Sequence, residues 1–277
     1  MDLQLKDKRA LVTGSSRGLG YATALALAKE GCRVAINSRD EAKACAAAKA
    51  IAAETGSQVI GLAGDVADPD VPGRLVGETV RAFGGPSTGS PVPAQAGPGL
   101  DILITNAGGP PSGAFESFNE ADWQKAIDLS LMSHVRLIRA ALPYLKQSKA
   151  ASVLTVTSYS VKQPIPNLVL SNSIRAATVG LTKSLALELG AAGIRFNSIL
   201  PAWTDTERVY DLMKSRAAQN RTTVEQEIAK QSMDSPLGRM GRPEEFANAA
   251  VFLVSPAASY ITGVMLAVDG GMYKGTF

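Results

Sequence analysis

A glycine-rich segment near the start of the chain constrains the fold more than any other feature. It reads TGSSRGLG over residues 13–20, follows an apolar run at 10–12 and opens an Ala/Leu-rich segment at 21–30. This order indicates a strand, a tight turn and a helix. Glycines let such a turn approach a pyrophosphate closely, and the N–H groups at the helix N-terminus favour an anion. The segment predicts a βα unit that binds a dinucleotide; a glycine-rich turn without a ligand is the alternative.

Strand-like apolar runs alternate with helical patterns along the rest of the chain. This alternation predicts an α/β, three-layer Rossmann-type doubly wound fold, with a parallel sheet of about seven strands and helices on both faces. The 277 residues are enough for one large domain, which we expect to span residues 1–277. The expected strands lie near 9–13, 33–37, 58–63, 100–105, 152–157, 195–200 and 264–268, and the expected helices near 19–30, 40–54, 70–83, 120–148, 171–190 and 243–254.

Two segments interrupt this alternation. Residues 84–99 are almost all Gly, Pro, Ser and Ala, a composition that predicts a flexible surface loop. Residues 202–241 are long for a connection and include a polar helical stretch at 207–231. Long connections in compact domains often act as lids, so we expect a lid-like segment here; a solvated helical insert is the alternative.

Charge and composition narrow the function classes. A formal net charge of +3, with no basic stripe, does not indicate a nucleic-acid or membrane-surface partner. No uncharged apolar stretch is long enough for a bilayer, and residues 1–7 show no signal-peptide pattern. Cys32 and Cys45 show neither metal spacing nor a disulfide framework, and no His/Cys/carboxylate cluster suggests a metal site. We therefore expect a cytoplasmic protein without metal.

Further motifs follow the glycine-rich segment. They are Asp65-Val66, Asn106-Ala107-Gly108, Ser158, GLTKSLALE at 180–188, RFNSI at 195–199, Pro201, SYITG at 259–263 and VDGG at 268–271. Together these motifs are similar to those of the short-chain dehydrogenase/reductase family over nearly the whole chain, and look most like its 3-oxoacyl-[acyl-carrier-protein] reductase branch. The resemblance implies an oxidoreductase that acts on a small-molecule carbonyl/alcohol pair, as a homo-oligomer, most often a tetramer, with a dimer as the alternative.

The same resemblance assigns the cofactor-binding residues. They come from the glycine turn, from the ends of later strands and from the start of the lid-like segment. They are Gly14, Ser16, Arg17, Gly18, Leu19, Gly20, Ser38, Arg39, Asp65, Val66, Asn106, Ala107, Gly108, Arg175, Pro201 and Thr206.

The catalytic residues depart from the family pattern. Members carry an Asn-Ser-Tyr-Lys tetrad, and Ser158 matches its serine. The Tyr and Lys positions are occupied by Ser171 and Arg175, and the Asn position by Ser130. Residues 106–111 and 164–172 resemble a divergent subgroup that also lacks the usual Tyr. We take Ser158, Ser171, Arg175 and Ser130 as the candidate catalytic residues.

The loss of the Tyr affects proton transfer more than cofactor binding. A phenol has a pKa of about 10 that a neighbouring cation lowers, whereas a serine hydroxyl is a far weaker acid. Arg175 keeps a charge and donors for ribose hydroxyls. Losing a general acid costs about 10²–10⁴-fold in rate. Two hypotheses stay open: an oxidoreductase with atypical acid/base residues, and a catalytically impaired dinucleotide-binding sensor or scaffold.

Three residues are possible replacements for the missing acid. Tyr159 follows Ser158, and strand alternation predicts that it faces away from the site. Lys162 is expected either to enter the site from its loop or to be solvated there. His134, the only histidine, is expected to be a packed or interface residue rather than a catalyst.

The end of the second strand discriminates between the two nicotinamide cofactors. An acidic residue there would accept hydrogen bonds from the ribose of NAD(H) and repel a 2′-phosphate. Ser38 stands at that position, with Arg39 next to it and Arg17 in the glycine turn. Two guanidinium groups suit a phosphate, which favours NADP(H) over NAD(H).

Overall fold

The protein, seen in a computed structural model, is described over residues 1–84 and 99–276. In these residues the strands are β1 (Arg9–Val12), β2 (Arg33–Ser38), β3 (Val59–Ala63), β4 (Ile102–Thr105), β5 (Ser152–Val156), β6 (Arg195–Pro201) and β7 (Met265–Val268). They form one parallel sheet in the order β3-β2-β1-β4-β5-β6-β7, which confirms the predicted α/β fold. The order reverses between β1 and β4, where sheets of this type bind ligands. Apart from Gly84 and Gly99, the loop predicted over 84–99 lies outside the described residues.

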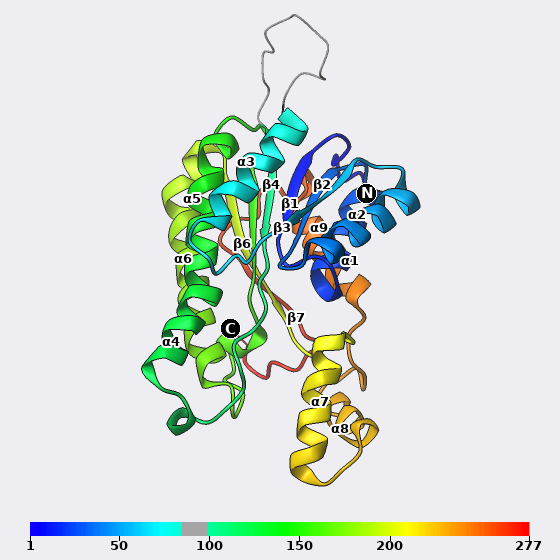
Figure 1. The fold of residues 1–277 in the computed structure, drawn as a ribbon, viewed down its shortest axis with the longest axis vertical. Helices are drawn as coiled ribbons and strands as arrows, with labels where there is room; N and C mark the ends of the chain where they lie inside the picture. Colours follow the sequence, from blue (N-terminus) through cyan, green and yellow to red (C-terminus); the bar gives the residue numbers. More distant parts are fainter. Residues whose placement is uncertain (85–98, 277) are drawn as a thin grey trace, which may run out of the picture.

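The helices are α1 (Gly18–Lys29), α2 (Glu41–Thr55), α3 (Val71–Gly84), α4 (Glu120–Ile127), α5 (Ser133–Leu145), α6 (Val169–Leu189), α7 (Glu207–Asn220), α8 (Val224–Ser232) and α9 (Pro243–Val254). Helices α1, α2 and α9 cover one face of the sheet, and α3, α5 and α6 cover the other (Figure 1). Each face encloses its own apolar core, because parallel strands are buried on both sides. No helix in the described ranges is long and apolar enough to cross a membrane.

The continuous helix predicted over 120–148 is wrong in detail. A π-helical turn, Asp128–Met132, separates α4 from α5. Inside this turn the backbone oxygen of Ser130 accepts a hydrogen bond from the Thr178 hydroxyl of α6 (2.5 Å). The widened turn lies where sequence reasoning placed a catalytic residue, and π-turns are frequent at functional sites.

The lid-like segment contains two helices rather than one continuous helical stretch. Arg221, with a left-handed φ of 57°, ends α7, and Thr223 begins α8 with a capping box. The two helices lie beside each other and project beyond the main body (Figure 1). Because α7 follows closely on β6, its first turn lies beside the carboxyl ends of the strands.

Candidate active site

Close packing in the turn between β1 and α1 requires its glycines. Gly14 and Gly18 have positive φ angles of 56° and 58°. A Cβ on Gly20 would lie 2.4 Å from the backbone oxygen of Gly14, and one on Gly14 would lie 2.8 Å from that of Asn106. Within the described chain, no side chain caps the α1 N-terminus at Arg17. Its N–H groups are therefore open to an anion.

Asn106, at the end of β4, holds this turn against the sheet. Its Nδ2 donates hydrogen bonds to the backbone oxygens of Thr13 (3.2 Å) and Gly14 (2.9 Å). The Thr13 hydroxyl donates to the backbone oxygen of Asn106 (2.7 Å) and accepts from its N–H (2.9 Å). The turn is thus fixed from the neighbouring strand before any ligand binds.

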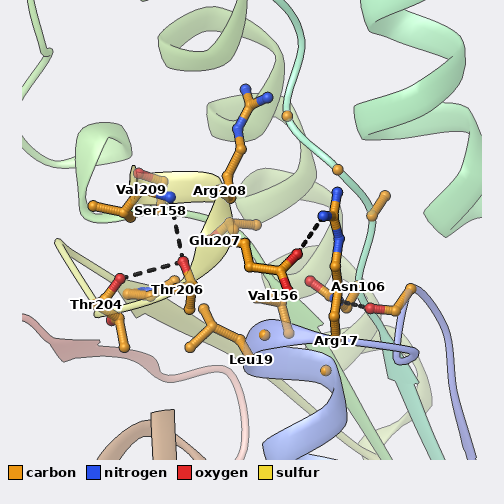
Figure 2. A pocket seen from close by; sticks show the side chains of 18 of the residues that line it. Arg17, Leu19, Asn106, Val156, Ser158, Thr204, Thr206, Glu207, Arg208 and Val209 are labelled. Atoms are coloured by element: carbon orange, nitrogen blue, oxygen red, sulfur yellow. Dashed lines mark hydrogen bonds and ion pairs between the residues drawn. The ribbon is translucent and has the colours of Figure 1, made fainter. Parts of the chain in front are cut away.

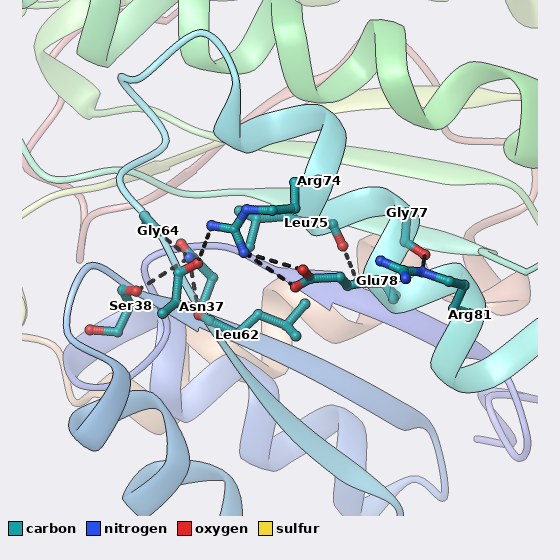
Figure 3. Close-up of polar contacts among 11 residues, drawn as sticks. Asn37, Ser38, Leu62, Gly64, Arg74, Leu75, Gly77, Glu78 and Arg81 are labelled. Atoms are coloured by element: carbon teal, nitrogen blue, oxygen red, sulfur yellow. Dashed lines mark hydrogen bonds and ion pairs between the residues drawn. The ribbon is translucent and has the colours of Figure 1, made fainter.

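Sequence reasoning missed a second anchor, Asn37, which lies at the end of β2 (Figure 3). Its Oδ1 accepts a hydrogen bond from the Gly14 N–H (3.3 Å), and its Nδ2 donates to the backbone oxygens of Leu62 (3.3 Å) and Gly64 (3.0 Å). The side chain is only 2% exposed, so these bonds compensate its burial. A lone Asn at a strand end carries no motif that would have marked it.

One cavity of about 530 Å³ lies over the carboxyl ends of β1, β2, β4, β5 and β6. The glycine turn, the strand ends, the start of α6 and the first turn of α7 form its walls. The sequence-predicted residues that line it are Gly14, Ser16, Arg17, Gly18, Leu19, Gly20, Ser38, Arg39, Val66, Asn106, Ala107, Gly108, Ser158, Ser171, Arg175, Pro201 and Thr206.

Two predicted site residues are not part of this lining. Ser130 is 1% exposed and its Oγ has no hydrogen-bond partner among the described residues, while the preceding Leu129 reaches the cavity. Asp65 accepts a hydrogen bond from the Ala67 N–H (3.0 Å), and only its neighbour Val66 lines the cavity.

Ser158, Ser171 and Arg175 come together at the cavity wall. The Ser158 Oγ accepts a hydrogen bond from the Ser160 N–H (3.1 Å), which fixes its side chain. Ser171 and Arg175 lie one helical turn apart on α6, so they share a face. Arg175 Nη1 donates to the backbone oxygens at the end of β5, those of Val156 (3.2 Å) and Thr157 (2.8 Å).

Tyr159 differs from its expected position. It borders the cavity, because β5 ends at Val156 and residues Tyr159–Val161 form a 3₁₀ turn, in which strand alternation does not hold. Its ring nevertheless packs in an apolar cluster with Trp203 and Met213, and it is 8% exposed. Burial raises the pKa of this phenol, which makes it a poorer proton donor.

The other two candidate acids do not line the cavity. Lys162 is exposed and its Nζ lies 5.1 Å from the centre of the Tyr273 ring, outside the cavity lining. His134 is buried, with Nδ1 2.6 Å from the Thr105 hydroxyl, which agrees with the expected packed role. Burial first, and then the charge of Arg175, lower the pKa of His134 to about 3.

The predicted ribose end of the cavity carries two exposed guanidinium groups. The Ser16 hydroxyl donates a hydrogen bond to Ser38 Oγ (3.2 Å), and Arg39 Nη1 lies 4.0 Å from a carboxylate oxygen of Asp65. Arg17 forms an ion pair with Glu207 of α7 (Figure 2). Both arginines are more than half exposed, so both are free to turn toward a ligand.

The first turn of α7 brings a further charged residue to the cavity that sequence reasoning did not single out. Arg208 lines the cavity, and its Nη2 donates to the backbone oxygen of Pro110 (3.4 Å) across it. Thr206 caps the helix by accepting from the Val209 N–H (3.4 Å), which sets its direction (Figure 2). An arginine in a polar helix has no sequence signal of its own.

Comparison with known sequences finds relatives along nearly the entire chain. A family model described as Enoyl-(Acyl carrier protein) reductase matches residues 14–273. The 3-oxoacyl-[acyl-carrier-protein] reductase of Synechocystis sp. is 32% identical over 264 residues, covering 95% of this chain and 96% of the relative. Dehydrogenase/reductase SDR family member 4 of Oryctolagus cuniculus is 33% identical over 268 residues, covering 96% and 94%.

Solved structures of reductases are also similar to this chain over nearly its whole length. L-sorbose reductase from Gluconobacter frateurii, complexed with NADPH and L-sorbose, superposes with a TM-score of 0.90 at 30% identity, covering 99% of this chain and all of the other. A variant of actinorhodin polyketide ketoreductase with NADPH gives a TM-score of 0.87 at 26% identity, covering 97% and 98%.

Proposed function

Because this chain belongs to the short-chain dehydrogenase/reductase family, we propose that it is an NADP-dependent oxidoreductase that interconverts a small-molecule carbonyl compound and its alcohol. The observation that carries the proposal is the single cavity that joins the glycine turn to Ser158, Ser171 and Arg175. A nicotinamide dinucleotide bound in this cavity supplies or accepts the hydride.

The cavity residues fit such a cofactor. The open α1 N-terminus and the backbone of Ser16 to Leu19 suit the pyrophosphate, because they offer N–H donors without a competing cap in the described chain. We assign the rest of the dinucleotide to Val66, Asn106, Ala107, Gly108 and Pro201 at the strand ends, to Arg175 on α6 and to Thr206 at the start of α7. Asp65, which lies 4.0 Å from Arg39, is assigned to the adenosine end.

NADP(H) is the favoured form of the cofactor. Ser38 presents no carboxylate to repel a 2′-phosphate, and Arg39 and Arg17 can each donate to one. The sorbose reductase and the polyketide ketoreductase are both described with NADPH, which supports the same choice.

Three side chains of this chain act on the substrate in our proposal. The hydroxyls of Ser158 and Ser171 donate hydrogen bonds to the carbonyl oxygen, and the charge of Arg175 stabilises the negative charge that develops on it. Neither hydroxyl is an acid near neutral pH, so water delivers the proton. We expect turnover slower by about 10²–10⁴-fold than with a positioned phenol.

A second function is favoured by the same substitutions. With Ser171 and Arg175 in place of Tyr and Lys, and Ser130 behind the cavity wall, the chain keeps the dinucleotide cradle and loses its strongest acid. A dinucleotide-dependent sensor or scaffold would need only the glycine turn and the strand ends that bind the dinucleotide. Turnover, not fold, distinguishes the two functions.

The test combines binding and turnover. We expect NADPH to bind more tightly than NADH in a fluorescence titration, and a panel of ketones and alcohols to include a substrate. Arg39→Asp should shift the preference toward NADH by roughly tenfold or more, because it removes a charge-assisted contact worth about 1.5–3 kcal/mol. Equal or tighter NADH binding by the wild type would overturn the NADP assignment. Tight NADPH binding without turnover would favour the sensor.

We further propose that residues 1–277 form one domain and that the protein works in the cytoplasm as a homo-oligomer, with a tetramer favoured over a dimer. We also propose that residues 202–241 form a lid over the cavity. Arg208 supports the lid, since it links α7 to Pro110 on the opposite wall. Limited proteolysis with and without NADPH tests it: we expect cleavage within 202–241 to slow when the dinucleotide binds.

A further inference from the structure

Two guanidinium groups converge beside Gly109, on the wall that follows β4. A methyl group built on Gly109 would lie 3.4 Å from Nη2 of Arg208 and 3.6 Å from Nη2 of Arg175. One atom placed at that point would therefore contact both side chains. Gly109 leaves the point open, and all three residues line the cavity.

The two charges have no neutralising partner in the part of the chain that the structure describes. Arg17 pairs with Glu207, whereas no carboxylate lies within 4.0 Å of the Arg175 or Arg208 nitrogens. Burial, followed by the charge of Arg208, lowers the pKa of Arg175 to about 10. The free protein thus holds two like charges near each other.

The position of Arg208 on its helix adds to the unfavourable electrostatic energy of the two like charges. It occupies the first turn of α7, where the helix dipole disfavours a cation. Its hydrogen bond to Pro110 is long, 3.4 Å, and is made to an uncharged oxygen. An anion between Arg208 and Arg175 would offset both the repulsion between the two guanidinium groups and the unfavourable interaction of Arg208 with the helix dipole.

We infer that the substrate carries a carboxylate, which Arg208 and Arg175 bind beside Gly109 while its carbonyl group faces Ser158 and Ser171. The inference rests on the proposed oxidoreductase function and names its substrate class. Arg175 can serve here because its Nη1 is already held by the end of β5, which leaves Nη2 toward Gly109.

The other lining residues indicate the chemistry of the rest of this substrate. Apolar side chains from the loop before α6, from the π-turn and from α7 line the same cavity as Ser171. They are Leu129, Ile165, Leu168, Val209 and Leu212. An oxo acid with an apolar substituent would bury that substituent against them.

The alternative is that Arg208 binds the dinucleotide pyrophosphate. The guanidinium of Arg208 extends away from Leu19 and the glycine turn in the close-up of the cavity (Figure 2). Arg17, which belongs to the turn itself, forms an ion pair with Glu207. This arrangement favours the substrate over the pyrophosphate as the ligand of Arg208.

Calorimetry on the NADP⁺-saturated protein tests the inference with two matched pairs of probes: benzoylformate with its methyl ester, and acetoacetate with its ethyl ester. We expect at least one acid to bind ten times or more tighter than its ester. Arg208→Gln should weaken that acid about 10- to 150-fold and leave the ester unchanged, as expected for loss of a charge-assisted contact. Lys214→Gln removes an exposed charge from the same helix and should change nothing.

Gly109→Ala provides a second variant that keeps both charges. Its methyl group would make ordinary contacts at 3.4 Å and 3.6 Å, so the fold should tolerate it, but it fills the proposed carboxylate position. We expect it to weaken acid binding as well. Equal binding of acid and ester in both pairs, or no acid binding, would overturn the inference.

A separate measurement distinguishes this failure from failure of the proposed function. The dissociation constant for NADPH should stay within about twofold of wild type in Arg208→Gln and Gly109→Ala. A larger loss would make Arg208 a dinucleotide ligand and sink the inference alone. If the wild type binds neither NADPH nor NADH, the proposed function itself is wrong.

Discussion

Ser171 and Arg175, which we propose as the family's Tyr and Lys positions, present a hydroxyl and a positive charge to the cavity. Arg175 is held by two backbone oxygens at the end of β5, and Ser171 lies one turn before it on α6. The charge is thus placed where we propose that it stabilises an oxyanion. Tyr159, a phenol that also borders the cavity, has a pKa raised by burial and packs against Met213 of α7.

The missing acid can be restored at these positions. We predict that Ser171→Tyr combined with Arg175→Lys raises the reduction rate of simple activated ketones, because a Lys-paired phenol recovers part of the 10²–10⁴-fold attributed to general acid catalysis. Full recovery is not expected, since the proposed Asn position holds Ser130 and a phenol overfills space shaped around a serine. NADPH oxidation by the double variant is compared with wild type and both single variants. Normal NADPH binding without any gain would show that the proton-donor position is misassigned.

His134 should make the stability of the protein depend on acid pH. Its pKa, about 3 in the folded protein against about 6.5 when unfolded, means that the unfolded chain binds the extra proton between these values. Burial of the neutral His134 therefore does not lower the free energy of unfolding above pH 6.5, but it lowers this free energy progressively as the pH falls from 6.5 toward 3. Between pH 6 and 4, the unfolding free energy of wild type should fall about 1.4 kcal/mol per pH unit faster than that of His134→Gln. Parallel slopes in urea titrations would contradict this.

At the scale of the elements, the turn from β1 to α1 and the strand ends around it are built from backbone contacts. Asn106 and Asn37 fix the turn from two neighbouring strands, and Gly14 and Gly20 allow the backbones to touch. The turn is consequently held on several sides. Helices α7 and α8 project from the body (Figure 1) and pack with Tyr159, Trp203 and Met272 in a separate, smaller apolar cluster.

Gly20→Ala should disrupt this turn. Its Cβ would lie 2.4 Å from the Gly14 oxygen and 2.8 Å from the Ser15 Cα, so the backbone has to move, at a cost of about 1–3 kcal/mol. We expect NADPH binding to be lost or weakened more than tenfold in a fluorescence titration. Gly73→Ala is the matched control: its Cβ meets nothing within 4 Å in α3, so it should stabilise the helix by up to about 1 kcal/mol and leave NADPH binding unchanged.

Sequence reasoning performs best for elements whose pattern is local. The strands are predicted by continuous apolar runs. The glycine turn is predicted by glycines at a spacing that a tight turn between a strand and a helix requires. The π-turn at Ser130 depends on a hydrogen bond from Thr178 on another helix, and the place of Arg208 depends on how α7 folds back over the cavity. Tyr159 was misplaced because the strand ends earlier than alternation assumes. These features arise from tertiary contacts that no local pattern encodes.

At the scale of the whole molecule, the outer face of α6 is a candidate contact between subunits. Sequence reasoning expects more apolar residues on this helix than one buried stripe needs. The structure shows that Leu181, Leu185 and Leu189 pack against the core, whereas Leu187 is 76% exposed on the helix face that also carries the exposed Gly180 and Ser184. An exposed leucine next to small residues suits close packing against a second copy.

We predict that the protein self-associates at micromolar concentration, most often as a tetramer, and that Leu187→Glu weakens the association. Burying one leucine contributes about 1.5–3 kcal/mol per copy, so the loss should be tenfold or more in the association constant. Light scattering across a dilution series measures it, with Glu188→Gln, also exposed on α6, as the control. A wild-type monomer would contradict the prediction.

The glycine turn has a consequence for descent. The anion site that we propose there consists of main-chain N–H groups, which every amino acid except proline carries, whereas the proposed reaction depends on a few side chains, Ser158, Ser171 and Arg175. Codon changes at those side chains can therefore replace or silence the chemistry while the dinucleotide is still held. A lineage built on this turn can give rise to new reductases, and also to proteins whose only input is the redox state of the dinucleotide pool.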